Sequence, residues 1–315
     1  MRAIERAGDL RFHCVGDTGG WRDPGPQRNV VAAMVEELGG ERPAAFFYHL
    51  GDVVYPHGEE AHYGAQFYTP YAAYSAPIFA IPGNHDAEAI PVTSAHSLDP
   101  FLKTFCSPSV PLHDAAVSPP RPTVHQPHVH WTLVHDWLWI IGLYTNVPEG
   151  GQLSADQLDW LVGELRAAPP QATVILALHQ PVYSIAVLHA SNLDLGDVLD
   201  ECFTRAGRVP EALFTAHSHN YQRFDRGVDG RRIPYVVAGS GGFWDRHEFG
   251  SGVPPTAVSL PGLPGVTLEA CQCDHHGYMT VTVGPGGAEV HYRTVSGDER
   301  RDFDTFALPT PAGRR

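Results

Sequence analysis

Five short clusters of polar side chains, each placed directly after a short apolar run, carry residue types that bind metal ions. The clusters are Asp17, Asp52 with Tyr55, Asn84 with His85 and Asp86, His179, and His217 with His219. Glycine recurs beside them, as expected where a chain turns sharply close to a ligand. Because ligands bind beyond the carboxyl ends of strands in open α/β sheets, we expect the five clusters to converge on one place.

The expected donors number seven, which is more than one metal ion needs. They are Asp17, Asp52, Tyr55, Asn84, His179, His217 and His219. Imidazole together with carboxylate suits first-row transition metals. Two ions can share one carboxylate and clamp both the attacking and the leaving oxygen of a phosphoryl transfer. A lone Gly-Asp is more often a turn and a lone His more often a core residue, so the prediction of a dinuclear site rests on the joint pattern.

The elements that must position these side chains alternate between strand and helix over the first two-thirds of the chain. Short apolar runs predict strands at 10–15, 44–50, 77–81 and 172–178, and runs on either side of Asp136 indicate a hairpin. Helical periodicity is found at 27–38, around 61–74, after the capping box Ser154–Gln157, and at about 192–206. Residues 87–127 are rich in Pro, Ser and His and predict a long surface loop or insertion.

The last third consists of short β runs separated by Gly and Pro. Alternating β and α followed by β-rich sequence predicts an α/β protein of packed sheets flanked by helices. Nothing in the sequence forces a boundary, so we expect a single domain over 1–315. Its motif-bearing core covers about 10–242, and the β-rich C-terminal part covers 243–315.

The composition excludes several classes of protein. With 35 acidic and 21 basic side chains the formal net charge is −14, which argues against a nucleic-acid surface. No apolar run reaches the length of about 18 residues that a transmembrane helix needs. The first residues lack an apolar signal region, so we expect a cytoplasmic location, with export left open. Five Cys at irregular spacing make a disulfide framework improbable, whereas 19 His favour imidazole-based metal sites.

The motifs GDTGG, GDVVY, GNHD, LALH and AHSH resemble the spaced blocks of the calcineurin-like metallophosphoesterase superfamily. Most of that superfamily has Asp-x-His in the first block, but Gly19 stands here in place of the His. Tyr55 instead follows Asp52 by three residues, and this pair of changes is similar to the purple acid phosphatase branch. The stretches HQPVYSIAVLH and AHSHNYQRF look most like its small, tartrate-resistant type, and the resemblance covers about residues 10–242.

The resemblance implies a four-layer αββα sandwich of two mixed β-sheets flanked by helices. It also implies a pair of metal ions, one Fe(III) and one divalent ion that is Fe, Zn or Mn. The implied ligands are Asp17, Tyr55 and His219 for the ferric ion, Asn84, His179 and His217 for the divalent ion, and Asp52 as the bridge.

The same resemblance implies attack by a metal-bound hydroxide, with His85 as proton donor to the leaving group. Asn84, His85 and His189 are the implied substrate-binding residues, although His189 reads equally as a solvent-facing loop residue. Ala216 departs from the usual Gly of the last block. Tyr221 either lines the pocket or packs against the sheet.

The expected function is therefore acid-phosphatase-like hydrolysis of phosphate monoesters. A phosphodiesterase or nucleotide pyrophosphohydrolase with the same metal core is the alternative, and a non-catalytic scaffold of the same fold is a remote one. We expect a small phosphate ester as the substrate, with no nucleic-acid or membrane partner. The oligomeric state, the physiological substrate and the divalent metal stay open.

Overall fold

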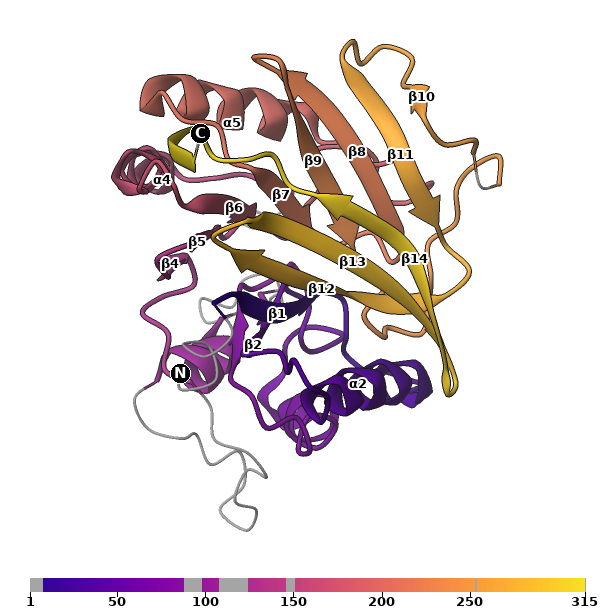
Figure 1. Ribbon diagram of the computed structural model, residues 1–315. Helices are drawn as coiled ribbons and strands as arrows, with labels where there is room; N and C mark the ends of the chain where they lie inside the picture. Colours follow the sequence, from indigo (N-terminus) through magenta and orange to yellow (C-terminus); the bar gives the residue numbers. More distant parts are fainter. Residues whose placement is uncertain (1–7, 88–97, 108–123, 146–150, 253, 315) are drawn as a thin grey trace.

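The computed structural model describes residues 8–87, 98–107, 124–145, 151–252 and 254–314, and two β-sheets lie at its centre (Figure 1). The first sheet has six strands in the order β14-β13-β12-β1-β2-β3. Its strands are β1 (Leu10–Val15), β2 (Phe46–His49), β3 (Ile78–Ala80), β12 (His276–Gly284), β13 (Gly287–Ser296) and β14 (Glu299–Ala307). β1, β2 and β3 are parallel, whereas β12 pairs antiparallel with β1. The two ends of the chain therefore share one sheet.

The second sheet has eight strands in the order β10-β11-β8-β9-β7-β6-β5-β4. Its strands are β4 (Trp131–Val134), β5 (Leu138–Gly142), β6 (Thr173–Ala177), β7 (Ala212–Thr215), β8 (Tyr221–Val228), β9 (Arg231–Ala238), β10 (Val258–Ser259) and β11 (Val266–Gln272). β5, β6 and β7 are parallel, and β4 pairs antiparallel with β5 as the predicted hairpin. Both sheets are thus mixed, which confirms the predicted fold class.

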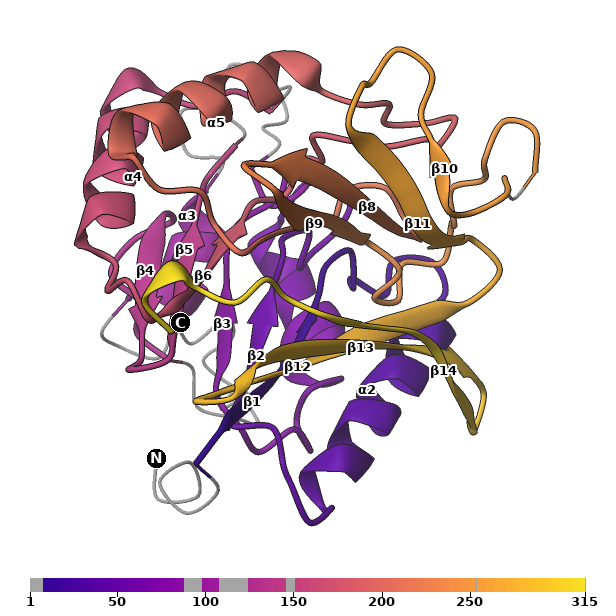
Figure 2. The ribbon, with the colours of Figure 1, turned by 45° about the horizontal axis from the view of Figure 1, so that its top comes forward.

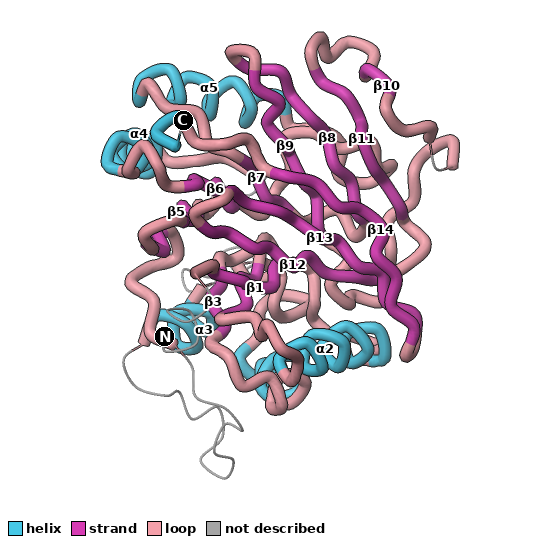
Figure 3. Tube along the Cα trace, viewed as in Figure 1, coloured by secondary structure: helices cyan, strands magenta, loops and turns pink. Residues whose placement is uncertain are grey.

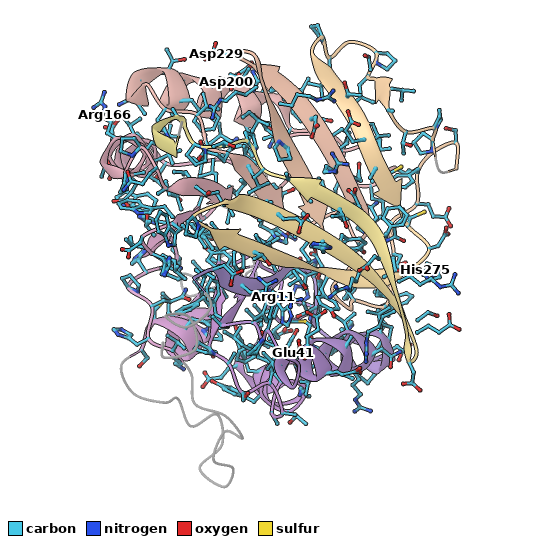
Figure 4. The ribbon with its side chains drawn as sticks, viewed as in Figure 1. Arg11, Glu41, Arg166, Asp200, Asp229 and His275 are labelled. Atoms are coloured by element: carbon cyan, nitrogen blue, oxygen red, sulfur yellow. The ribbon has the colours of Figure 1, made fainter. Side chains whose placement is uncertain are left out.

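Helices cover the outer faces of the two sheets (Figures 2 and 3). The α-helices are α2 (Gly25–Leu38), α3 (Asp99–Phe101), α4 (Ala155–Ala167) and α5 (Leu193–Ala206). α2 packs against β12 and β13, while α4 and α5 lie side by side on the eight-stranded sheet. Arg226 of β8 forms an ion pair with Asp200 of α5, at the end of the molecule where Figure 4 labels Asp200. No helix in the described part of the chain is long and apolar enough to cross a bilayer.

Alternation along each strand builds the layers, because successive side chains of a strand point to opposite faces. On β1, Phe12 and Cys14 belong to the core between the sheets, whereas Val15 packs with α2. On β6, Ile175 and Ala177 face the other sheet, whereas Val174 and Leu176 face the helices. The parallel strands are buried on both faces, which explains their continuous apolar sequences.

The predicted capping box of α4 is half formed. The Ser154 hydroxyl accepts a hydrogen bond from the backbone N–H of Gln157 at 3.3 Å. The Gln157 side chain does not return to Ser154; it bonds to the backbone N–H and C=O of Tyr144 at 2.8 and 2.9 Å. Gln157 therefore ties the start of α4 to the chain that leaves β5.

The stretch predicted as a long loop at 87–127 contains helical structure. α3 continues into a π-helix at Leu102–Cys106, where Phe101 and Phe105 are buried against the aromatic cluster under the first sheet. Burial of these aromatic side chains stabilises helical structure there, although the local sequence has no clear helical period. Residues 88–97 and 108–123, and with them His113, lie outside the described residues. The helix predicted around 61–74 forms as a 3₁₀ turn at Glu60–His62 and a π-helix at Gly64–Tyr68.

Glu37 of α2 holds this helix to three strands of the first sheet. Its carboxylate accepts hydrogen bonds from Tyr278 at 2.6 Å and Arg11 at 2.9 Å, pairs with Arg293, and lies 3.3 Å from the His13 ring. In Figure 4, Arg11 lies between β1 and α2. Burial alone would raise the pKa of Glu37, but the hydrogen bonds from His13 and Tyr278 and the charge of Arg293 hold it well below its usual value.

We expect Glu37→Gln to lower the free energy of unfolding by about 1.5–3 kcal/mol near neutral pH, the range for hydrogen bonds to a charged group. The folded-state pKa is depressed, so this contribution is present above the ordinary value of 4.5 and is lost as the pH falls below it. Urea unfolding from pH 7 to pH 3 should show the two proteins converge in stability. Glu36→Gln, on the exposed face of the same helix, is the matched control. A difference that does not change with pH would contradict this role.

Candidate metal centre

The predicted site residues follow parallel strands of both sheets and meet where the carboxyl ends of those strands face one another. Asp17 follows β1, Asp52 and Tyr55 follow β2, Asn84 and His85 follow β3, His179 follows β6, and His217 and His219 follow β7. The structure brings all of them together. Ligand atoms of Asp17, Asp52 and His219 lie within 4.8 Å of one another.

The Tyr55 hydroxyl lies at the centre of one group of donors. It is 3.2 Å from Asp17 Oδ1, 3.1 Å from Asp52 Oδ2 and 3.3 Å from His219 Nε2. All four side chains are buried. This is a cluster of hard oxygen donors with one imidazole.

A second group surrounds His179. Its Nε2 lies 3.1 Å from Asn84 Oδ1 and 3.4 Å from Asp52 Oδ2. The His217 ring meets the His179 ring edge-on, with 5.1 Å between the ring centroids. Asp52 therefore contacts both groups of donors, the position that a bridging ligand needs.

Backbone carbonyls fix the tautomers of two of these histidines. His179 Nδ1 donates to the carbonyl of Leu50 at 2.9 Å, and His219 Nδ1 donates to the carbonyl of Asp245 at 2.7 Å. Each ring then presents its Nε2 atom to the buried carboxylates. Hydrogen bonds of this kind fix the orientation of imidazoles that bind metal ions.

The electrostatics of the cluster fit a cation. Burial raises the pKa values of Asp17 and of the Tyr55 hydroxyl. Asp52 is held well below its usual pKa despite its burial, because His179 and His85 lie beside it. Burial would lower the pKa of His179, but Asp52 and Asp17 raise it to about 9. Metal ions at this place would balance the same buried charge, and the donor set fits the implied metal pair.

The loops that carry these donors hold unusual backbone conformations. Asp17, Asp52 and His217 have φ values of 55°, 56° and 67°, in the left-handed region that most side chains avoid. Such strain persists where the surrounding structure over-determines it, and it concentrates at functional sites. Gly83 is required beside them, since a Cβ there would lie 2.1 Å from Asp52 Oδ1.

Asp86 braces the loop after β2 against the loop after β3. Its buried carboxylate accepts hydrogen bonds from the backbone N–H groups of Val53 at 3.0 Å, Val54 at 3.1 Å and Gly83 at 2.9 Å. Both loops carry candidate ligands, so Asp86 sets the separation between those ligands.

His85 and His189 both lie beside the donor cluster. The His85 backbone N–H donates to Asp52 Oδ1 at 2.9 Å, and its Nδ1 donates to the Pro56 carbonyl at 2.6 Å. His189 is exposed, and its ring centroid lies 3.8 Å from that of His217. Its φ of 62° also places it among the strained residues of the site.

Two open points from the sequence are resolved. Tyr221 packs against the sheet: it is fully buried, stacks on Tyr292 at 3.8 Å and donates to Asp304. Ala216 is accommodated because Gly16 faces it; a Cβ on Gly16 would lie 2.5 Å from the Ala216 Cβ.

The segment 243–247 belongs to the site, although sequence reasoning treated everything after 242 as generic. Phe243 stacks on Tyr55, with ring centroids 4.0 Å apart, and its N–H donates to the Asp17 carbonyl. His247 Nδ1 accepts the backbone N–H of His219 at 3.1 Å, and the His247 N–H donates to the His219 carbonyl. No sequence motif identifies these residues as part of the site; their role is visible only from their contacts in the folded protein.

The His247 ring also stacks on the His219 ring, with centroids 3.9 Å apart and an angle of 20° between the planes. Burial lowers the pKa of His247 to about 4, so its ring is neutral near pH 7 and Nδ1 can accept a hydrogen bond. His247 thus restrains both the backbone and the ring of His219.

Comparison with known proteins gives a consistent result. The family model for calcineurin-like phosphoesterases matches residues 10–221. A search among curated proteins finds no match.

Solved structures of low sequence identity share the fold. Purple acid phosphatase PPD1 from yellow lupin (Lupinus luteus) has a TM-score of 0.72 at 15% identity, over 97% of this chain and 55% of its own. GAP50, the anchor in the inner membrane complex of Plasmodium, has a TM-score of 0.63 at 14% identity, over 96% and 89%. A dimetal phosphatase from Danio rerio has a TM-score of 0.55 at 12% identity, over 95% and 99%. The chain thus spans little more than half the length of the lupin protein.

Three substitutions separate the two contacts of His247. His247→Asn keeps an acceptor for the His219 N–H, His247→Phe keeps the stacked ring, and His247→Ala removes both. We expect His247→Ala and His247→Phe to weaken metal binding by about 10–100-fold, as loss of an outer-shell partner does, and His247→Asn to stay near wild type. Chelator competition measures the dissociation constants. Equal metal affinity in all four proteins would refute this role.

Proposed function

Because the chain belongs to the calcineurin-like phosphoesterase family, we propose that it is an acid-phosphatase-like enzyme that hydrolyses phosphate monoesters with two metal ions. One observation carries the proposal: seven donor side chains from five strand ends meet, and one of them, Asp52, contacts two separate groups of the others. A single ion would leave several of these donors unused. The fold shared with purple acid phosphatase PPD1 and with the Danio rerio dimetal phosphatase is consistent with it.

The donor chemistry supports an unequal pair of ions. Asp17, Tyr55 and His219 would hold a ferric ion, because a phenolate and a carboxylate are hard anionic donors. Asn84, His179 and His217 form a neutral set that suits a divalent ion of iron, zinc or manganese. Asp52 would be shared. The bound ions would supply Lewis acidity and neutralise charge on the phosphoryl oxygens.

His85 and His189 supply the remaining functions in this proposal. His85 lies beside the donor cluster without belonging to it, so its imidazole is available to protonate the leaving oxygen. Its contacts with Asp52 and Pro56 hold both backbone and ring in place. The His189 ring packs on the His217 ring, where it would contact a phosphoryl oxygen of the substrate.

A non-catalytic role is the competing function, since GAP50 has this fold and is described as an anchor. The complete donor set and the presence of His85 favour catalysis over that role. Diester or pyrophosphate hydrolysis uses the same core and would be distinguished by kcat/KM on matched esters.

Metal analysis together with the visible spectrum tests the proposed centre. We expect about two metal ions per chain, including iron, and a broad tyrosinate-to-iron absorption band. Tyr55→Phe should abolish the band while circular dichroism stays unchanged, and Asp52→Asn should abolish turnover in a folded protein. A colourless protein with two non-ferric ions would remove Tyr55 from its assigned role. A protein that binds no metal after reconstitution would overturn the proposal.

The role of His85 predicts a dependence on the leaving group. His85→Ala should lower kcat by about 10²–10⁴ for alkyl phosphates, whose alkoxide needs a proton. The loss should be much smaller for p-nitrophenyl phosphate, whose phenolate leaves unprotonated. Equal losses on both substrates would show that His85 acts in some other way.

A further inference from the structure

A cavity of about 210 Å³ opens beside the donors assigned to the divalent ion. Asn84 and His217 form the wall toward the metal centre. The remaining described lining residues are Gln180, Pro181, His189, Ala190 and Asn192. A cavity of this size suits a small part of a substrate rather than a large ligand.

Gln180 is the polar group aimed into this cavity. It follows the ligand His179 directly and is only 5% exposed. The buried Thr145 hydroxyl donates to Gln180 Oε1 and fixes one end of the amide. Within the described residues, Gln180 Nε2 has no hydrogen-bond partner. This N–H group can therefore donate a hydrogen bond to a ligand oxygen in the cavity.

The rest of the wall defines the chemistry of the occupant. Its described residues include no Lys or Arg, which a second phosphate would call for. They combine the amide of Gln180 with the apolar surfaces of Pro181 and Ala190, whereas the amide of Asn192 is already hydrogen-bonded to the backbone of Leu195 and Gly151. This mixture suits a neutral alcohol that carries several hydroxyl groups on a short carbon chain.

We propose that this cavity receives the leaving alcohol of a small neutral polyol phosphate of about the size of glycerol phosphate, with Gln180 as the residue that recognises its hydroxyl groups. The inference rests on the proposed phosphomonoesterase function and names its substrate class. The metal ligands recognise the phosphoryl group, and Gln180 distinguishes alcohols by hydrogen bonding. A site built to bond a hydroxyl group rejects the analogue that lacks it, because its own polar group is then left unpaired.

Glycerol 1-phosphate and propyl phosphate provide the test, because they share a three-carbon chain and differ in two hydroxyl groups. With the metal-loaded wild-type protein we expect kcat/KM for glycerol 1-phosphate to exceed that for propyl phosphate at least about tenfold. Gln180→Leu, which keeps the volume and removes the amide, should bring this ratio close to one. Thr145→Val, which releases the amide from its fixed orientation, should give an intermediate ratio.

Two controls make the result specific. Leu193→Ala alters an exposed side chain next to Asn192 but outside the cavity lining, and should preserve the wild-type ratio. Inorganic phosphate should inhibit wild type and Gln180→Leu with the same constant, since it occupies only the phosphoryl site.

Three outcomes would overturn the inference while leaving phosphatase activity established. They are equal kcat/KM for the two esters in wild type, an unchanged ratio in Gln180→Leu, and a parallel change in the inhibition constant of phosphate. Failure to hydrolyse any phosphate ester with both metals bound would instead overturn the proposed function, and the substrate class with it.

Discussion

Asp17 and Asp52 place two carboxylates in the interior of the protein, at the junction of its two sheets. Within the described structure, their ion-pair partners are the imidazoles of His179 and His219, and neither carboxylate pairs with a Lys or Arg. An uncompensated buried carboxylate costs several kcal/mol, and imidazole carries charge only when protonated. Bound cations would balance this buried charge directly.

The fold meets this constraint by bringing loops from both sheets together at the carboxyl ends of their parallel strands. Parallel strands deliver the donors at their carboxyl ends, and backbone groups orient several of them, among them His179 and His219. Leu50 and Asp245 supply carbonyls to the ligand histidines, and Asp86 gathers the N–H groups of two loops. The strained conformations of Asp17, Asp52 and His217 persist because these contacts over-determine them. These hydrogen bonds therefore hold in place the loops whose side chains must be positioned for a metal ion.

The sequence predicted the parts of this site that are locally encoded. A donor that directly follows an apolar run, such as Asp17 or His179, is visible because strand, turn and ligand are contiguous. The two-sheet architecture followed from the order of β and α segments together with the family resemblance. In both cases the information lies within a few residues of the feature that it predicts.

The remainder depends on contacts between distant segments. His247 lies 28 residues beyond the ligand that it restrains, and no local pattern distinguishes it from a surface histidine. The pairing of β12 with β1 joins residues near opposite ends of the chain. The helical turn at Asp99–Phe101 forms because Phe101 and Phe105 have an aromatic cluster to bury against, not because of its own periodicity. Tertiary packing decides such features, so a single sequence does not reveal them.

A difference between surface charge and buried charge explains how a chain with a net charge of −14 could act on an anion. Surface charges are screened over about 8–10 Å, whereas ions held by buried donors act on a phosphoryl group at contact distance. In the proposed enzyme, the metal centre would attract the anion. The described lining of the adjoining cavity contains no Lys or Arg and offers the Gln180 amide instead. Because that amide would add little to phosphate affinity, it would discriminate among alcohols without strengthening the binding of the phosphate product that must leave.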